Sequence, residues 1–142
     1  LINQANDLPG NLVLAPTTTV KAGVGNADTV TDGTPDTVWS ARGERNQWLG
    51  FDFGESRIIH RYVVRHAGDA GMDPALNTRG FTLRASADGK TWNTLDTITN
   101  QTRDVTDVEF PPTRARYAKI VIQQPGSDGT ARIADVEIYG KR

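Results

Sequence analysis

The segment 81–95 constrains the fold more than any other part of this sequence. Apolar residues alternate with polar ones from Phe81 through Leu83, which is the pattern of a strand with one buried face. Asp88-Gly89 then separates this run from a second one, and this dipeptide is a strong signal for a tight hairpin turn. The pattern predicts antiparallel β-sheet.

Several other segments have the composition of strands, because they are rich in β-branched and aromatic residues. In the first of them Leu49, Phe51 and Phe53 share one face. The segments are 47–53, 57–65, 117–123 and 132–139. We therefore expect an all-β fold, an antiparallel β-sandwich or jelly roll of about eight strands. Residues 1–142 are expected to form a single domain, with 1–10 as a loosely held lead-in.

Charge and composition argue against several classes of partner. The 142 residues include 16 basic and 17 acidic side chains, so that the formal net charge is −1. This balance gives no electrostatic reason to expect binding to nucleic acid or to a membrane. Cysteine is absent, which removes disulfides and thiolate metal sites. Since the chain opens on Leu1, we expect it to be part of a longer polypeptide.

The segment 29–40 is rich in side chains that carry oxygen. Asp32 and Asp36 flank a Gly-Thr-Pro turn, with threonine hydroxyls before, between and after them. Calcium takes six to eight such oxygen ligands, from carboxylates, hydroxyls and backbone carbonyls. An ordinary Asp-Gly turn between two strands would also contain these residue types, because Asp, Gly and Pro favour the backbone conformations of turns. The residues alone leave both interpretations open, a turn or a calcium-binding loop.

No catalytic constellation is apparent in the sequence. The two histidines are His60 and His66, and His60 lies in an apolar strand where a structural role is favoured. There is no Gly-x-Ser-x-Gly motif, no cysteine nucleophile and no histidine cluster with the spacing of a catalytic zinc site. The chain is therefore not expected to be an enzyme.

Four motifs follow one another in the order of a known family. They are Asp32-Gly33-Thr34-Pro35-Asp36-Thr37-Val38-Trp39, the strand 47–54, the hairpin 81–92 with Asp88-Gly89 and Trp92, and the final strands 115–120 and 133–140. With these motifs the chain resembles discoidin-like (factor V/VIII type C) domains, and especially the bacterial family 32 carbohydrate-binding modules. The resemblance implies an eight-stranded jelly roll of the galactose-binding-domain-like type, with a structural calcium ion and a ligand site on loops at one end.

The resemblance also implies a biological setting. Bacterial members are non-catalytic, lectin-like modules of secreted glycoside hydrolases and related enzymes, which they hold on a glycan. We expect an extracellular bacterial module, a monomer within a larger multidomain enzyme, that binds an oligosaccharide or glycan, with galactose-type sugars among the candidates. The alternative is an adhesion domain for a protein or phospholipid surface, as in animal relatives.

The calcium ligands implied by the resemblance come from both halves of the chain. Side chains are expected from Asp32, Thr37 and Asp135, and backbone carbonyls from Thr29, Asp36 or Ala134. Glu137 is the alternative acidic ligand, because residues two apart in a strand face the same side.

The glycan site is expected in the long segment 66–80, since loops of this length are often functional. Galactose-binding relatives use a His, an Arg and an Asn, often an acidic residue, and an aromatic ring against the sugar. The matching candidates here are His66, Asp73, Asn77 and Arg79. The segment contains no aromatic residue, so Met72 or the segment 124–128 is expected to supply the flat contact. The three tryptophans lie in family core motifs and are expected to be structural: Trp39, Trp48 and Trp92.

Overall fold

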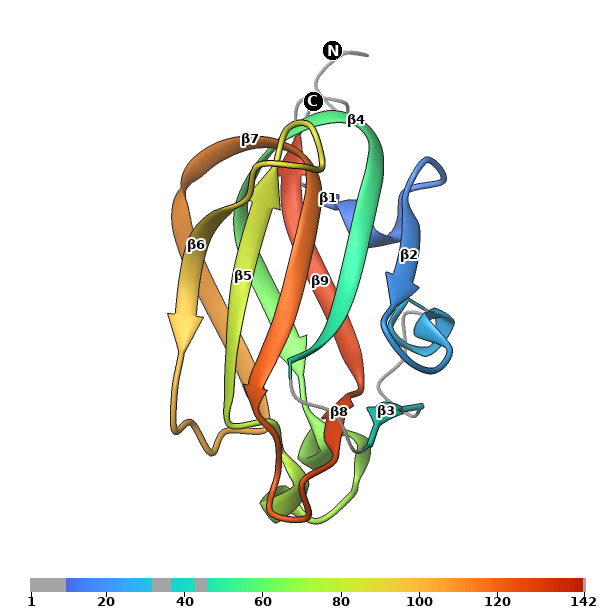
Figure 1. Ribbon diagram of the computed structural model, residues 1–142, viewed down its shortest axis with the longest axis vertical. Coiled ribbons are helices and arrows are strands. Elements are labelled where there is room, and N and C mark those ends of the chain that lie inside the picture. Colours follow the sequence, from blue (N-terminus) through green and yellow to red (C-terminus); the bar gives the residue numbers. More distant parts are fainter. Residues whose placement is uncertain (1–9, 32–36, 43–45, 142) are drawn as a thin grey trace.

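Two long strands that pass from one layer of a β-sandwich to the other organise the whole molecule (Figure 1). The computed structural model describes residues 10–31, 37–42 and 46–141. The strands in this part of the chain are β1 (Gly10–Asn11), β2 (Thr19–Ala22), β3 (Trp39–Ala41), β4 (Gln47–Arg65), β5 (Gly80–Ser86), β6 (Asn93–Ile98), β7 (Val105–Gln124), β8 (Ala131–Ile133) and β9 (Asp135–Lys141).

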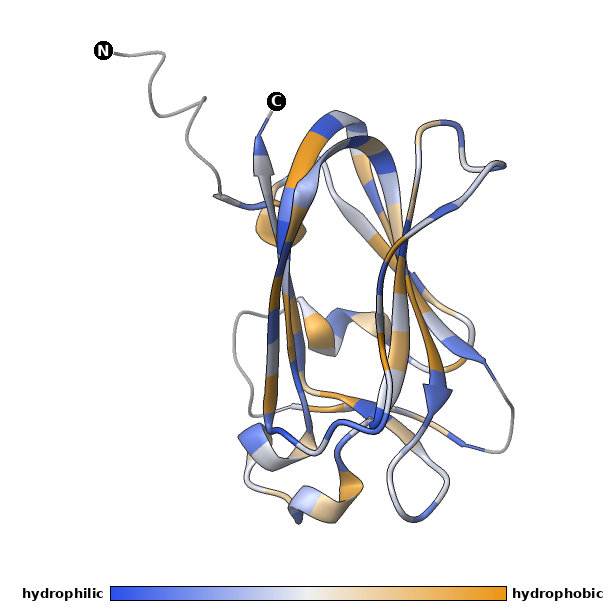
Figure 2. Ribbon diagram, turned by 90° about the vertical axis from the view of Figure 1, so that its left-hand side faces the viewer, coloured by the Kyte–Doolittle hydropathy of each residue, from blue (hydrophilic) through white to orange (hydrophobic). Residues whose placement is uncertain are grey.

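All strand pairs are antiparallel. The first layer contains β2, the first half of β4, the second half of β7, then β5 and β6. The second layer contains β1, β9, the second half of β4 and the first half of β7. β3 and β8 form a separate short pair. Figure 2 shows the layers from the side, with connecting loops at both ends.

β4 can serve both layers because it bends at a glycine. Gly54 has a φ of 83°, in the left-handed region, and the β4–β7 ladder is interrupted between Asp52 and Arg57. A Cβ atom at Gly54 would lie only 2.7 Å from the Thr17 carbonyl oxygen, so the bend leaves no room for a side chain. The Asp52 carboxylate accepts a hydrogen bond of 2.8 Å from the Gly54 amide and fixes the turn.

The space between the layers is filled by apolar side chains. Leu49, Phe51 and Phe53 share one face of β4, as the alternation predicts, and each is at most 2% exposed. They meet the apolar faces of the second layer, including Val136 and Ile138 of β9. Because strand side chains alternate between faces, the residues between these apolar ones point to the outside of the sandwich.

The predicted antiparallel β-sandwich is confirmed, and its strand boundaries differ from those predicted. The described residues form nine strands where about eight were expected. Two of the nine, β1 and β3, are only two and three residues long. The segments 47–53 and 57–65 are one continuous strand. Conversely, 132–139 is broken at Ala134, whose amide donates to the Arg65 carbonyl at 2.8 Å instead of joining a ladder. Of the predicted lead-in, Gly10 lies in β1 and 1–9 are outside the described residues.

The helices in the described residues are short 3-10 turns. They are η1 (Leu12–Leu14), η2 (Ala27–Val30), η3 (Ala67–Ala70) and η4 (Pro74–Leu76). None of them is long and apolar enough to cross a membrane. η3 and η4 lie together at the end of the sandwich opposite the C-terminus (Figure 1). We call this end the loop end, and define it by the segments 66–79, 99–104 and 124–130.

Candidate functional site

Backbone hydrogen bonds join the three segments of the loop end. The Arg79 amide donates to the Gln124 carbonyl at 2.8 Å, and the Gln101 amide donates to the Arg79 carbonyl at 3.0 Å. The Ser127 amide donates to the Ala75 carbonyl at 3.0 Å. The sequence places these segments far apart, whereas the structure makes them one continuous surface.

A hollow of about 210 Å³ lies on this surface. It is lined by Pro74, Ala75, Asn77, Arg79, Gln101 and Thr102. Arg79 is exposed, and it is the one charged residue in this lining. The lining contains no aromatic ring, so a sugar here would meet mainly hydrogen-bonding groups and the Pro74 ring.

Asn77 contributes to the floor of this hollow, but its side chain is almost completely buried, since the residue is only 1% exposed. Its Oδ1 accepts a 2.7 Å hydrogen bond from the Gly68 amide. Its Nδ2 donates to the Arg103 carbonyl at 3.2 Å and to the Asp104 carboxylate at 3.0 Å. Asn77 therefore ties two segments of the loop end together, and it has almost no surface to offer a ligand.

His66 is also inside the protein, with an exposed fraction of 0%. Its Nε2 lies 2.8 Å from the Thr106 hydroxyl oxygen, and its ring packs against Phe81 with 5.6 Å between ring centroids. Nδ1 is buried and has no hydrogen-bond partner among the described residues. Burial lowers the pKa of His66 to about 4, although the Asp104 carboxylate acts in the opposite direction. The imidazole is therefore neutral at neutral pH and is part of the core.

Asp73, the fourth predicted sugar ligand, is exposed at the start of η4. Its Oδ1 accepts a 2.9 Å hydrogen bond from the Ala75 amide and caps the turn. Met72 beside it is 37% exposed. Of the four candidates, Asp73 and Arg79 have accessible side chains, whereas His66 and Asn77 hold the loops in place from within.

The expected calcium site lies only partly within the described residues, since Asp32 and Asp36 are outside them. The Thr37 hydroxyl donates to the Thr29 carbonyl at 3.3 Å, so two of the expected ligands are neighbours. β3 pairs Trp39 with Ile133, which directs the chain before β3 toward Ala134 and Asp135. Within the described residues, no three His, Cys, Asp or Glu side chains gather as a possible metal site.

The two acidic residues of β9 have different environments. Asp135 is 7% exposed and begins the strand. The Glu137 carboxylate is already engaged, since it pairs with Arg65 at 2.9 Å and accepts a short hydrogen bond from the Tyr139 hydroxyl. Asp135 also has a contact of its own, so the choice between the two as the acidic ligand of β9 stays a prediction.

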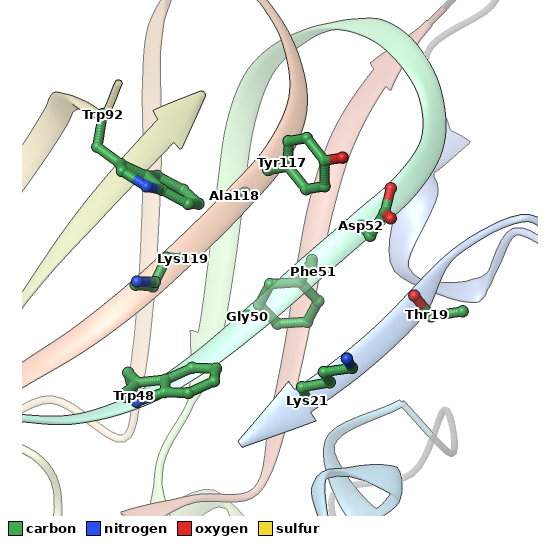
Figure 3. Close-up of a pocket in the computed structure, with 10 residues that line it drawn as sticks. All are labelled: Thr19, Lys21, Trp48, Gly50, Phe51, Asp52, Trp92, Tyr117, Ala118 and Lys119. Atoms are coloured by element: carbon green, nitrogen blue, oxygen red, sulfur yellow. The ribbon is translucent and has the colours of Figure 1, made fainter. Parts of the chain in front are cut away.

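A second hollow lies on the outer face of the first layer (Figure 3). It encloses about 240 Å³, and its lining includes Trp48, Trp92, Tyr117, Lys21, Lys119 and Asp52. We call this surface the sheet face. Trp48 and Trp92, which are expected from the sequence to be structural like Trp39, are only partly buried on this face. Trp39 is structural as expected: it is 2% exposed, and its Nε1 donates to the Val24 carbonyl at 2.7 Å.

The sequence did contain a signal for the position of Trp48. If Leu49, Phe51 and Phe53 face the core, then strand alternation places Trp48 on the opposite, outer face. Trp92 has no such signal, because it lies in the turn before β6 and its direction depends on that turn.

The described residues thus form an antiparallel sandwich with hollows at the loop end and on the outer face of one layer. The chain matches a sequence family of the F5/F8 type C class, described as NedA-like, galactose-binding domain, over residues 29–120. This match covers more than half of the chain, and the protein belongs to that family. A comparison with curated protein sequences gives no match.

Solved structures of similar fold include family 32 and chitosan-binding modules. CpGH89CBM32-5 from Clostridium perfringens, in complex with GalNAc-β-1,3-galactose, is 19% identical, with a TM-score of 0.79 over 91% of this chain and 99% of that one. The family 32 module of C. perfringens NanJ, in complex with galactose, is 18% identical, with a TM-score of 0.78 over 93% and 99%. Chitosan-binding module 1 from a Paenibacillus sp. IK-5 chitosanase/glucanase is 25% identical, with a TM-score of 0.76 over 92% and 99%. All three are named as binding modules, which agrees with the prediction that the domain is not an enzyme.

Proposed function

We propose that this carbohydrate-binding fold holds a glycan at the loop end, with Arg79 as the principal contact. The observation that carries the proposal is an exposed guanidinium in a hollow whose walls are fixed by backbone hydrogen bonds. A planar guanidinium presents several N–H donors in a fixed fork, which suits two neighbouring sugar hydroxyls. Asp73 at the start of η4 offers carboxylate oxygen as an acceptor near the same surface.

His66 and Asn77 are positioning residues in this proposal. Asn77 holds η3 against the 102–104 segment, and His66 anchors the beginning of the loop to Thr106 in β7. A ligand surface that is already ordered loses less conformational entropy when it binds. We expect weak affinity for a single sugar, because the hollow is shallow and its hydroxyl contacts stay partly hydrated.

Titration of the ¹⁵N-labelled domain tests the proposal. Galactose, GalNAc-β-1,3-galactose and chitosan oligosaccharides are suitable probes, because similar modules bind them. Amide shifts are expected in 73–79 and 101–102, and Arg79→Ala is expected to weaken binding by at least about tenfold. Arg114→Ala is the control, since Arg114 lies in the first half of β7 and donates a hydrogen bond to Ser56 of β4, away from the hollow. If no glycan of a broad panel shifts any amide, the proposal is wrong.

Calcium is a further part of the proposed function. Carboxylate, hydroxyl and carbonyl oxygens are the ligands that this hard cation prefers, and Thr29, Thr37 and Asp135 supply all three kinds, with Asp32 and Asp36 as additional candidates. Bound calcium would join the segment before β3 to the start of β9. We expect calcium at 100 times its Kd to stabilise the fold by about 2.7 kcal/mol.

Melting curves in chelator, magnesium and calcium check this expectation. Calcium is expected to raise the melting temperature, whereas Asp32→Ala and Asp135→Asn are expected to reduce the rise. Identical melting in chelator and in millimolar calcium would show that these residues form an ordinary turn.

The proposed setting is a secreted, extracellular module that keeps an attached enzyme close to its glycan. The support for it is that a similar module is named as part of a chitosanase/glucanase. A fusion of this domain to a fluorescent protein should be retained on an insoluble glycan that carries the recognised sugar. The Arg79→Ala fusion should be washed off under the same conditions.

A further inference from the structure

A row of basic side chains crosses the sheet face from strand to strand. Lys21 of β2 lies opposite Gly50 of β4, Gly50 lies opposite Lys119 of β7, and Lys119 lies opposite Arg84 of β5. Directly opposite residues in antiparallel strands point to the same face. The register therefore places three cations in one line, with a glycine between two of them as the floor of a hollow.

This arrangement opposes the stability of the sheet. Lys119 and Arg84 are direct cross-strand neighbours of like charge, which is a destabilising pairing. Neither they nor Lys21 forms an ion pair with another described residue. The carboxylate lining the hollow, Asp52, pairs with Arg116 at 3.0 Å. The sheet face thus has an excess of positive charge although the whole chain has a formal charge of −1.

Two indole rings flank the middle cation of this row (Figure 3). The Lys119 ammonium nitrogen is 4.7 Å from the Trp92 ring centroid and 5.3 Å from that of Trp48. These contacts hold the ammonium group in place without neutralising its charge. Lys119 therefore presents a positioned cation between two partly exposed aromatic surfaces.

Glycines allow the Trp48 ring to lie close to the backbone. A Cβ at Gly50 would lie 3.1 Å from Cζ3 of the indole, and a Cβ at Gly23 would lie 2.8 Å from its Nε1. The indole thus covers two positions that have no side chain, and a larger residue at either one would push it away. The ring is seated in a place that fits it closely.

The Asp88-Gly89 turn fixes Trp92 in a comparable way. The Asp88 carboxylate accepts hydrogen bonds from the Lys90 and Thr91 amides at 2.8 and 2.9 Å. These hydrogen bonds lower the pKa of Asp88, because they stabilise the ionised carboxylate. Trp92 follows this turn directly, and its position is set before any ligand arrives.

We propose that the sheet face is a second binding site, for a saccharide that carries acidic groups. An indole packs well against the apolar C–H face of a sugar ring, and the carboxylate or sulfate of the same sugar would pair with Lys119 and its neighbours Lys21 and Arg84. An acidic saccharide fits this site because its negative charge complements the basic row and its ring can pack against the two indoles. The proposal rests on the proposed function for its ligand class, but it uses residues that the loop end does not.

Single-stranded nucleic acid also binds to combinations of aromatic and basic residues. Its high charge density favours proteins with extended basic surfaces, whereas this basic row is local and the chain is slightly acidic overall. An acidic sugar needs only a few cations beside a ring, and that is what the sheet face provides.

The experiment uses indole N–H signals in ¹H–¹⁵N spectra, with Trp39 as the internal control because it is buried. The probes are an oligogalacturonide, its methyl ester, a sulfated galactan oligosaccharide and a short single-stranded DNA. The oligogalacturonide should shift the Trp48 and Trp92 signals and leave Trp39 unchanged, and the uncharged methyl ester should bind at least about tenfold more weakly. The sulfated probe tells whether the site prefers carboxylate or sulfate.

Variants give the second part of the test. Lys119→Gln and Trp92→Ala should each weaken oligogalacturonide binding by about tenfold or more. Lys141→Gln, the same charge change at the end of β9, should leave binding unchanged. The inference is overturned if the acid and its ester bind equally, if Lys119→Gln has no effect, or if DNA alone shifts the two indoles. Neutral sugars that still bind at the loop end would then leave the proposed function intact.

Discussion

The loop end and the sheet face use their polar side chains in opposite ways. At the loop end, Asn77 and His66 turn inward and complete hydrogen bonds that hold separate segments together. On the sheet face, Lys21, Lys119 and Arg84 turn outward and form no ion pair within the described residues. The comparison teaches that polar side chains within a candidate binding region can stabilise the fold, whereas charged side chains without an ion pair on a regular sheet are the basis of the second proposed site. The two regions should therefore respond differently to pH and to mutation.

The largest expected effect is a loss of stability in acid caused by His66. Its pKa falls from an ordinary value of 6.5 to about 4 in the folded protein because the imidazole is buried. The unfolded chain therefore binds the proton more readily, and stability decreases as pH falls from about 6.5 to about 4. This change should reach about 3 kcal/mol.

Urea unfolding of the wild type and of His66→Leu between pH 7 and 4 measures that effect. The carboxylates with lowered pKa titrate in both proteins. The difference between the two slopes of unfolding free energy against pH therefore comes from His66. Parallel pH profiles would contradict the burial of His66 in the core.

The second prediction concerns Asn77→Ala. This change leaves the Gly68 amide and the Arg103 carbonyl without a partner, and we expect the free energy of unfolding to fall by about 2 to 3 kcal/mol. Asn93→Ala, at an exposed position of β6, should change it by less than about 0.5 kcal/mol. Equal effects of the two substitutions would mean that the Asn77 contacts do not hold the loop end together.

The smallest predicted effect is an increase in stability, whereas the two effects above are losses. Arg84→Gln removes one member of a like-charge cross-strand pair and should stabilise the fold by a few tenths of a kcal/mol, roughly 0.2 to 0.5, at low salt. The gain should disappear in 1 M salt, because screening weakens exposed charge interactions. A loss of stability instead would show that Arg84 has a structural role and would weaken the contrast between the two regions.

The sequence predicts the fold better than the binding surfaces. Alternation at Leu49, Phe51 and Phe53 and the Asp88-Gly89 hairpin depend on local patterns, and both are present in the structure. The full length of β7 was not predicted, because polar residues and Pro111-Pro112 separate its first half from the apolar run of its second half. A long strand that serves two layers has no short-range signal.

The candidate site residues depend on contacts across larger distances in the chain. Asn77 is buried because residues 102–104 cover it, and His66 because Thr106 and Phe81 surround it. No pattern around positions 66 or 77 reveals these partners. The row of cations needs the register of four strands at once, which becomes visible only after the sheet is assembled.

The sharing of β4 and β7 between the layers has a consequence for how the domain folds. Neither layer can detach without breaking two strands that also belong to the other, so unfolding should be a single cooperative transition. The pairs that join β4 to β7 and β9 connect distant parts of the sequence, and such non-local topology slows folding to milliseconds or seconds. The two ends of β4 carry Trp48 and Arg65 respectively, so the sheet face and the start of the loop end should become ordered in the same cooperative transition.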